Sequence, residues 1–73
     1  MAKRSITIAG HRTSISLEEP FWRSLAEIAA ERARPMAAVI AEIDRTRPPG
    51  SNLSSAIRVF VLEWARATAA RRF

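Results

Sequence analysis

The chain has 73 residues, 48% hydrophobic and 26% charged, a length that fits one small domain and excludes a Rossmann unit, a barrel or a two-domain enzyme. With no cysteine and one histidine it lacks a thiol nucleophile and has too few ligands for a zinc or iron–sulfur site, so we expect neither a metal nor a cofactor. Twelve Lys and Arg against seven Asp and Glu give a formal net charge of +5, which favours a polyanion as partner.

Residues 11–17 alternate between polar and apolar side chains and are enriched in β-branched types. A period of two predicts a β-strand over this range. Residues 5–8 alternate in the same way ahead of Gly10-His11, so residues 1–10 form either a basic arm or an extra strand. The stretch 1–16 contains no acid, which makes it the basic end of the chain.

The pattern changes at Glu18-Glu19-Pro20. Two acids suit the positive end of a helix, and proline is tolerated in a first turn because it has no N–H bond to lose there. A helix is predicted over 18–33 from apolar residues at helical spacing, namely Phe21, Trp22, Leu25, Ile28 and Ala29. Ser16-x-x-Glu19 also matches a capping box, which leaves the boundary between strand and helix open by a residue or two.

Two further helices follow. A new helix is predicted to begin at Pro35, because a shorter apolar stripe follows it over 35–45. Residues 46–51 form a loop, since Pro48-Pro49-Gly50 cannot continue a helix. Ser51 or Asn52 caps a helix over 52–70, whose apolar stripe is Leu53, Ala56, Ile57, Phe60, Val61, Trp64 and Ala65.

The helix over 52–70 is apolar on more than one side, because Val59 and Leu62 lie off its main stripe. A monomer of this size could hardly cover both sides, so we expect a subunit interface there. No apolar run approaches the roughly 18 residues of a membrane span. No signal-peptide core follows the N-terminus either, so we expect no membrane partner and a cytoplasmic location.

A lone strand leaves backbone N–H and C=O groups unpaired, and the best-formed partner for residues 11–17 is a second copy of the same strand. We therefore expect an antiparallel ribbon between two protomers. Its inner side chains would be Thr13, Ile15 and Leu17, and its outer ones Arg12, Ser14 and Ser16. Such a ribbon fits a DNA major groove about 12 Å wide. The alternative folds residues 5–9 back onto 11–17 as an internal hairpin that needs no partner.

Residues 8–18 with Phe21-Trp22, and residues 52–63, resemble a group of short bacterial ribbon-helix-helix proteins, and the likeness covers nearly the whole chain. The resemblance implies a mainly α fold with one N-terminal β-strand, and an intertwined homodimer whose paired strands form an intersubunit two-stranded antiparallel ribbon. It also implies that the ribbon enters the major groove of double-stranded DNA and that the protein acts as a transcriptional repressor.

The resemblance assigns roles to particular positions. Arg12, Ser14 and Ser16 match the family's base-reading residues, and Pro35-Met36-Ala37 matches its phosphate anchor. The chain departs from the family at that anchor, because Ala33-Arg34-Pro35 offers no capping hydroxyl. The helix dipole, the N–H groups of Met36 and Ala37, and Arg34 remain to bind phosphate. Residues 52–57 are an alternative for the family's second helix, with 35–45 an insertion, although connection length favours the break at Pro35.

The remaining candidates are phosphate contacts and interface residues. Lys3 and Arg4 are expected to bind phosphates from a flexible arm. His11 has a structural or phosphate-contact role and not a catalytic one, because no motif places a nucleophile or an acid beside it, and we expect no enzyme. The dimer interface is expected to use Ile15, Leu17, Ile40, Phe60 and Trp64.

Two other functions stay open beside sequence-specific DNA binding by a homodimer. An antitoxin of this fold would bind a toxin and its own operator, but such proteins usually carry a polar tail where this chain has an apolar-striped helix. The helix over 52–70 also sets arginines around an aromatic stripe, as helices that bind membrane surfaces or other proteins do. The sequence leaves the operator, any effector and higher oligomers on DNA open.

Overall fold

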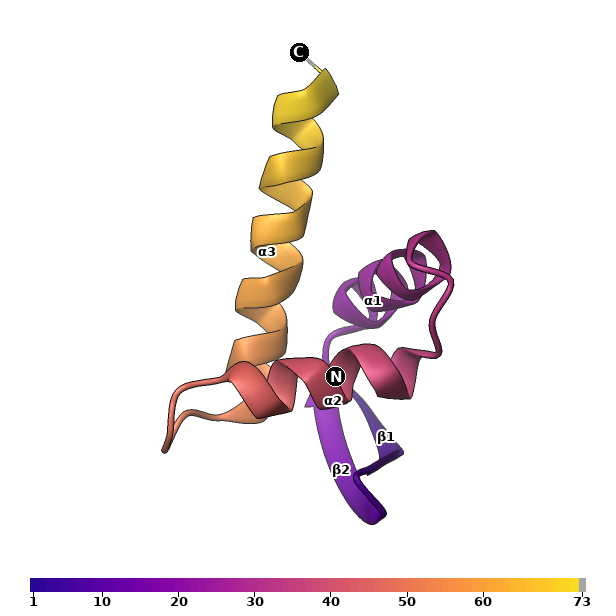
Figure 1. Cartoon of the computed structure of the whole chain (residues 1–73), viewed down its shortest axis with the longest axis vertical. Coiled ribbons are helices and arrows are strands. Elements are labelled where there is room, and N and C mark those ends of the chain that lie inside the picture. Colours follow the sequence, from indigo (N-terminus) through magenta and orange to yellow (C-terminus); the bar gives the residue numbers. More distant parts are fainter. Residues whose placement is uncertain (73) are drawn as a thin grey trace.

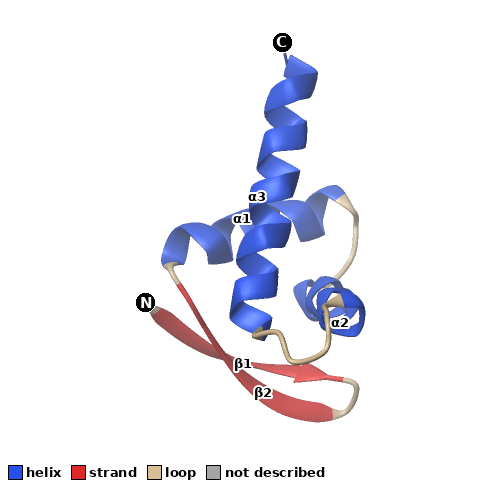
Figure 2. Ribbon diagram, turned by 90° about the vertical axis from the view of Figure 1, so that its left-hand side faces the viewer, coloured by secondary structure: helices blue, strands red, loops and turns tan. Residues whose placement is uncertain are grey.

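The computed structural model describes residues 1–72 and consists of a β-hairpin followed by three helices. The elements are β1 (Ala2–Ile8), β2 (His11–Leu17), α1 (Glu19–Glu31), α2 (Met36–Thr46) and α3 (Leu53–Arg72). The ribbon of β1 and β2 forms one end of the molecule, the C-terminal half of α3 projects at the other, and α1 and α2 lie between them (Figures 1 and 2). None of these helices combines the length and apolar composition that crossing a membrane requires.

The ribbon is a hairpin within one chain. Its strands run antiparallel and place three outer pairs opposite each other, Lys3 and Ser16, Ser5 and Ser14, and Thr7 and Arg12. The two turn residues both have positive φ, 51° at Ala9 and 82° at Gly10. Positive φ at both positions is typical of the type I′ turn, whose twist matches that of the paired strands.

This pairing corrects the expectation that the two strands of the ribbon come from two protomers. The partner of β2 is β1 of the same chain, so the internal hairpin is the arrangement present, and residues 1–10 supply an extra strand instead of a flexible arm. The physical reason is that β1 adds to the core. Ile8 is buried, Ile6 packs against the core, and the indole N–H of Trp22 donates to the Ala2 carbonyl at 2.9 Å.

One hydrophobic core joins the ribbon to all three helices. Its buried members are Ile8, Ile15, Leu17, Trp22, Leu25, Ile28, Ala29, Val39, Ile40, Ile43, Ile57 and Val61. The described residues include no buried polar or charged side chain. Because the core lies against the inner face of the ribbon, the outer face is left to solvent.

The helix ends show how the chain breaks between elements. Glu18 is the N-cap of α1 without a side-chain cap bond and Ser16 lies in β2, so the capping box is not formed. After α1, Ala33 adopts φ 51° and the N–H of Arg34 donates to the Ala29 carbonyl at 3.0 Å, which closes the helix in the way a left-handed glycine usually does. Asn52 caps α3 by accepting the N–H of Ser55 at 3.2 Å.

Candidate nucleic-acid interface

The outer face of the ribbon is a continuous polar surface. Side chains directly opposite in an antiparallel pair project to the same face. This face therefore consists of Lys3, Ser5 and Thr7 from β1 and Arg12, Ser14 and Ser16 from β2. Five of the six are exposed and Ser16 is half-buried, whereas Ile15 and Leu17 on the inner face are buried. The face thus carries four hydroxyls, with Ser16 opposite Lys3 at one end, Thr7 opposite Arg12 at the other, and Ser5 and Ser14 between them.

The charge on the ribbon is entirely positive, and the nearest acids are paired. Residues 1–17 contain no Asp or Glu. The carboxylate of Glu18 accepts from the Arg58 guanidinium at 3.0 and 3.4 Å, and this hydrogen bond lowers the pKa of Glu18. The carboxylate of Glu19 lies 3.8 Å from the Arg4 guanidinium. The two acids that follow the ribbon are therefore compensated by arginines and do not oppose an anion at its outer face.

Arg4, predicted as a phosphate contact on a flexible arm, is an ordered strand residue opposite Ile15. Its guanidinium lies over the Trp22 ring, 4.8 Å from the centroid. The side chain is still 47% exposed. Arg4 is thus held at the edge of the ribbon, separate from Lys3 on the outer face. His11 is exposed at the tip of the hairpin, between the turn and Arg12.

The predicted phosphate anchor lies at the start of α2, where the N-cap Pro35 forms no side-chain cap bond. Ala38 and Val39 donate to the Pro35 carbonyl at 3.0 and 3.2 Å, and no hydrogen bond found among residues 1–72 uses the N–H of Met36 or Ala37. Free N–H groups at a helix N-terminus attract anions. The backbone part of the anchor is therefore open to a ligand.

Arg34, the charged part of that predicted anchor, is engaged elsewhere. Its guanidinium donates to the Glu42 carboxylate at 2.6 Å, and the two side chains are 43% and 41% exposed. This ion pair lowers the pKa of Glu42. A phosphate at the start of α2 would have to compete with Glu42 for Arg34.

The five residues predicted for the dimer interface divide into two groups. Ile15, Leu17 and Ile40 are at most 2% exposed within the single chain, so they belong to its own core. Phe60 and Trp64 are half-buried on α3. An apolar stripe in the sequence does not show whether a residue on it packs in the core of its own chain or in an interface with another chain.

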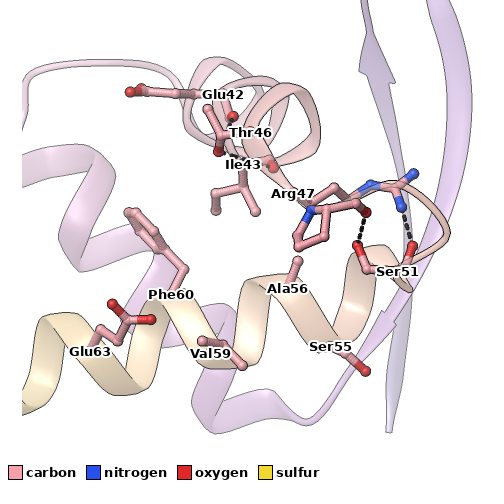
Figure 3. Close-up of a pocket in the computed structure, with 11 residues that line it drawn as sticks. Glu42, Ile43, Thr46, Arg47, Ser51, Ser55, Ala56, Val59, Phe60 and Glu63 are labelled. Carbon is pink, nitrogen blue, oxygen red and sulfur yellow. Dashed lines mark hydrogen bonds between the residues drawn. The ribbon is translucent and has the colours of Figure 1, made fainter.

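The surface of α3 retains uncovered apolar area. Val59 and Leu62 are 54% and 55% exposed. An apolar groove of about 440 Å³ runs between α3 and the C-terminal part of α2, with Ile43, Ala56 and Phe60 among its lining residues (Figure 3). Arg47 also lines the groove, and its guanidinium donates hydrogen bonds to the Asp44 carboxylate and to the Ser51 carbonyl.

The sequence analysis did not single out Ser5 and Thr7, which with Lys3 form the β1 half of the outer face. The signal for them was present in the alternation of residues 5–8. It could be used only once β1 was known to pair with β2, because the register decides which β1 side chains join Arg12 and Ser14 on one face.

A family model described as a ribbon-helix-helix domain matches residues 1–65 of the chain. The matched range contains the ribbon, α1, α2 and most of α3, and with them every candidate residue discussed above. Neither the curated proteins nor the solved structures provide a significant match. No cluster of three or more metal-ligating side chains occurs among residues 1–72.

Proposed function

Because the chain belongs to the ribbon-helix-helix domain family, whose members are in general DNA-binding transcription regulators, we propose that it binds double-stranded DNA sequence-specifically as a homodimer and acts as a transcriptional repressor. The observation that carries the proposal is the outer face of the ribbon, which is exposed, polar, free of acids and two strands wide. A major groove about 12 Å wide admits such a ribbon, and its base edges distinguish all four base pairs.

In this proposal Arg12 reads a base and its neighbours hold the ribbon in register. The guanidinium fork of Arg12 suits the O6 and N7 acceptors of guanine, and the hydroxyls of Ser14 and Ser16 bond to any base edge. Lys3 contacts phosphate, as do Arg4 and His11 at the edge and tip of the ribbon. The free N–H groups of Met36 and Ala37, with Arg34 beside them, anchor a further phosphate.

The proposed homodimer covers the apolar surface of α3. A partner copy on α3 would cover Val59 and Leu62, which the single chain leaves 54% and 55% exposed, and would complete the burial of the half-buried Phe60 and Trp64. Burial of apolar area is the main favourable term in such association. A two-fold dimer presents two ribbons, which suits an operator with two related half-sites.

The test is a duplex selected from a random library with the purified protein, followed by titration of variants against the selected and a random duplex. Arg12→Ala should lose most of the preference for the selected duplex, since each bidentate arginine contact is worth about 1–3 kcal/mol of discrimination. Arg23→Ala is the matched control, because Arg23 is an exposed arginine on α1. It should retain the wild-type preference.

Lys3→Ala separates phosphate binding from base reading. It should weaken both duplexes alike and make the salt dependence shallower by about 0.9 in slope for each phosphate that the variant no longer neutralises. If Arg12→Ala lowers the affinity for both duplexes equally, or changes neither, the ribbon is not the reading element and the proposal fails.

A further inference from the structure

The groove between α2 and α3 has no part in DNA binding by the ribbon. It has a volume of about 440 Å³, and its apolar lining includes Ile43, Ala56, Val59 and Phe60 (Figure 3). Pockets that bind small molecules have volumes of about 300–1,000 Å³ and are lined mainly by apolar side chains with a few polar groups. The groove therefore has the size and the lining of a small-molecule site.

We propose that this groove binds a small organic cation, whose aromatic or aliphatic body lies against Ile43 and Phe60 and whose charged group lies at Glu63. The inference goes beyond the proposed function, because the site is made from α2, α3 and the loop between them and needs no DNA.

The charges along the groove determine the sign of the ligand. Three charged side chains line the groove, and the chain itself compensates two of them. The Glu42 carboxylate accepts from Arg34 at 2.6 Å, and the Arg47 guanidinium donates to the Asp44 carboxylate at 2.7 Å. Glu63 forms no ion pair with any side chain that the structure describes. The charge left for a ligand is one carboxylate, which favours a cation over an anion.

Glu63 lies at one end of the apolar lining. It follows Phe60 by three residues on α3, a spacing that makes the two side chains neighbours on the helix surface, and Figure 3 shows both toward the same end of the groove. The Arg32 guanidinium lies 5.2 Å from the centroid of the Phe60 ring, but Arg32 does not line the groove. Because Glu63 is exposed, a cation that meets it keeps part of its hydration. The apolar body thus supplies most of the affinity, and Glu63 supplies the preference for positive charge.

The other end of the groove is held by hydrogen bonds within the chain. The Arg47 guanidinium donates to the Ser51 carbonyl, and the Ser51 hydroxyl donates to the Pro48 carbonyl at 2.6 Å (Figure 3). The Thr46 hydroxyl donates to the Glu42 carbonyl at 3.0 Å. Because these polar groups already have partners, the groove exists before a ligand arrives, and binding does not have to order its walls.

A ligand in the groove would also affect the proposed homodimer. Val59 and Phe60 belong both to the groove lining and to the apolar surface of α3 that a partner copy would cover. Because the ligand and the partner copy need the same side chains, each is expected to weaken the binding of the other. Ligand binding is therefore best measured at low protein concentration.

The experiment titrates the purified chain with three probes of similar shape, phenylbutylamine, phenylbutanol and phenylbutyrate, and follows the backbone amide chemical shifts. In neutral solution the first probe is a cation, the second is uncharged and the third is an anion. The amine should shift the amides of residues 43–63 saturably and bind more tightly than the acid, although the net charge of +5 favours anions over the whole surface. The alcohol should fall between them.

Glu63→Gln tests the charge of the site. It should weaken binding of the amine about two- to fivefold, which is the effect of one exposed ion pair, and leave the alcohol unchanged. Glu27→Gln is the matched control, because Glu27 is an exposed glutamate on α1. It should bind all three probes as the wild type does.

A second pair of variants tests the place of binding. Val59 and Leu62 are both on α3 and are 54% and 55% exposed, but of the two only Val59 lines the groove. Val59→Ser should weaken binding of all three probes, by about fourfold for each methylene-sized contact that is lost. Leu62→Ser should match the wild type.

Several outcomes would overturn the inference. Absence of saturable shifts at residues 43–63, equal affinity for amine and acid, or an amine affinity unchanged in Glu63→Gln would show that the groove is not a cation site. Equal effects of Val59→Ser and Leu62→Ser would show that the probes bind the surface that a second copy covers. Because none of these measurements includes DNA, this site and the proposed DNA binding can each fail while the other stands.

Discussion

The ribbon and α3 differ in how much of their apolar surface is buried within the chain. The inner face of the ribbon is fully covered within the chain, with Ile15 and Leu17 at 2% and 0% exposure, and its outer face is polar. Helix α3 buries Ile57 and Val61 but leaves Val59 and Leu62 more than half exposed. The comparison indicates that both strands of the ribbon come from one chain, whereas α3 leaves uncovered the apolar surface that the proposed partner copy would bury.

The largest expected effect comes from comparing the two tryptophans, one in each region. Trp22 is 1% exposed and bonds to Ala2, while Trp64 is half-buried on α3. Trp22→Ala should lower the free energy of unfolding by about 3–5 kcal/mol, as expected for a fully buried aromatic residue. Trp64→Ala should cost less in dilute solution. Urea unfolding of both variants measures the two losses of stability. An equal loss at every protein concentration would show that Trp64 is as much a part of the single chain's core as Trp22.

A second prediction concerns the unfinished surface of α3. If a second copy covers it, the melting temperature should rise with protein concentration, because only the folded state dimerises. Leu62→Glu should abolish that rise, since it places a charge in the proposed contact without disturbing the core. Ala26→Glu, at an exposed position of α1, should keep it. Melting that is independent of concentration, together with a monomer mass in sedimentation, would show that α3 needs no partner of its own kind.

The smallest effect concerns the ion pair that joins the two regions. Glu18 follows β2 directly and Arg58 lies on α3, and their hydrogen bond lowers the pKa of Glu18 in the folded state. The unfolded chain therefore takes up this proton first as the pH falls. The contribution of the pair is present above the ordinary pKa of glutamate and is lost as the pH falls through the folded pKa.

Glu18→Gln should accordingly reduce the difference in unfolding free energy between pH 7 and more acidic solution. The reduction should be small, because Glu18 is 45% exposed and solvent screens the pair. Arg58→Gln should give a similar reduction, and the double variant should add nothing to it. Additive effects would mean that the two side chains act independently.

Much of the fold could be predicted from periodicity. The apolar stripes gave all three helices, and alternation gave both β2 and the outward placement of Arg12, Ser14 and Ser16. These patterns are local, and they record which side of an element meets the core. The family resemblance added the ribbon-helix-helix fold, which the match over residues 1–65 confirms.

The pairing of the elements could not be predicted with the same means. The backbone groups that pair two strands are the same for every residue type except proline. The sequence of residues 11–17 therefore did not show whether this strand pairs with β1 or with a second copy of itself. The turn gave a weak signal, because Ala9 takes a positive φ that alanine rarely adopts. The ion pair of Glu18 with Arg58, and that of Arg34 with Glu42, depend on tertiary packing and changed which charges are free to meet a ligand.

The two-residue turn between β1 and β2 also determines how the ribbon comes into being. Hairpins close in about 1–10 μs, because their contacts are local in the chain. A ribbon assembled from two chains would have to wait for a collision, at a rate proportional to concentration. A hairpin within one chain closes by a first-order step, so the rate at which β1 pairs with β2 is expected to be independent of the protein concentration.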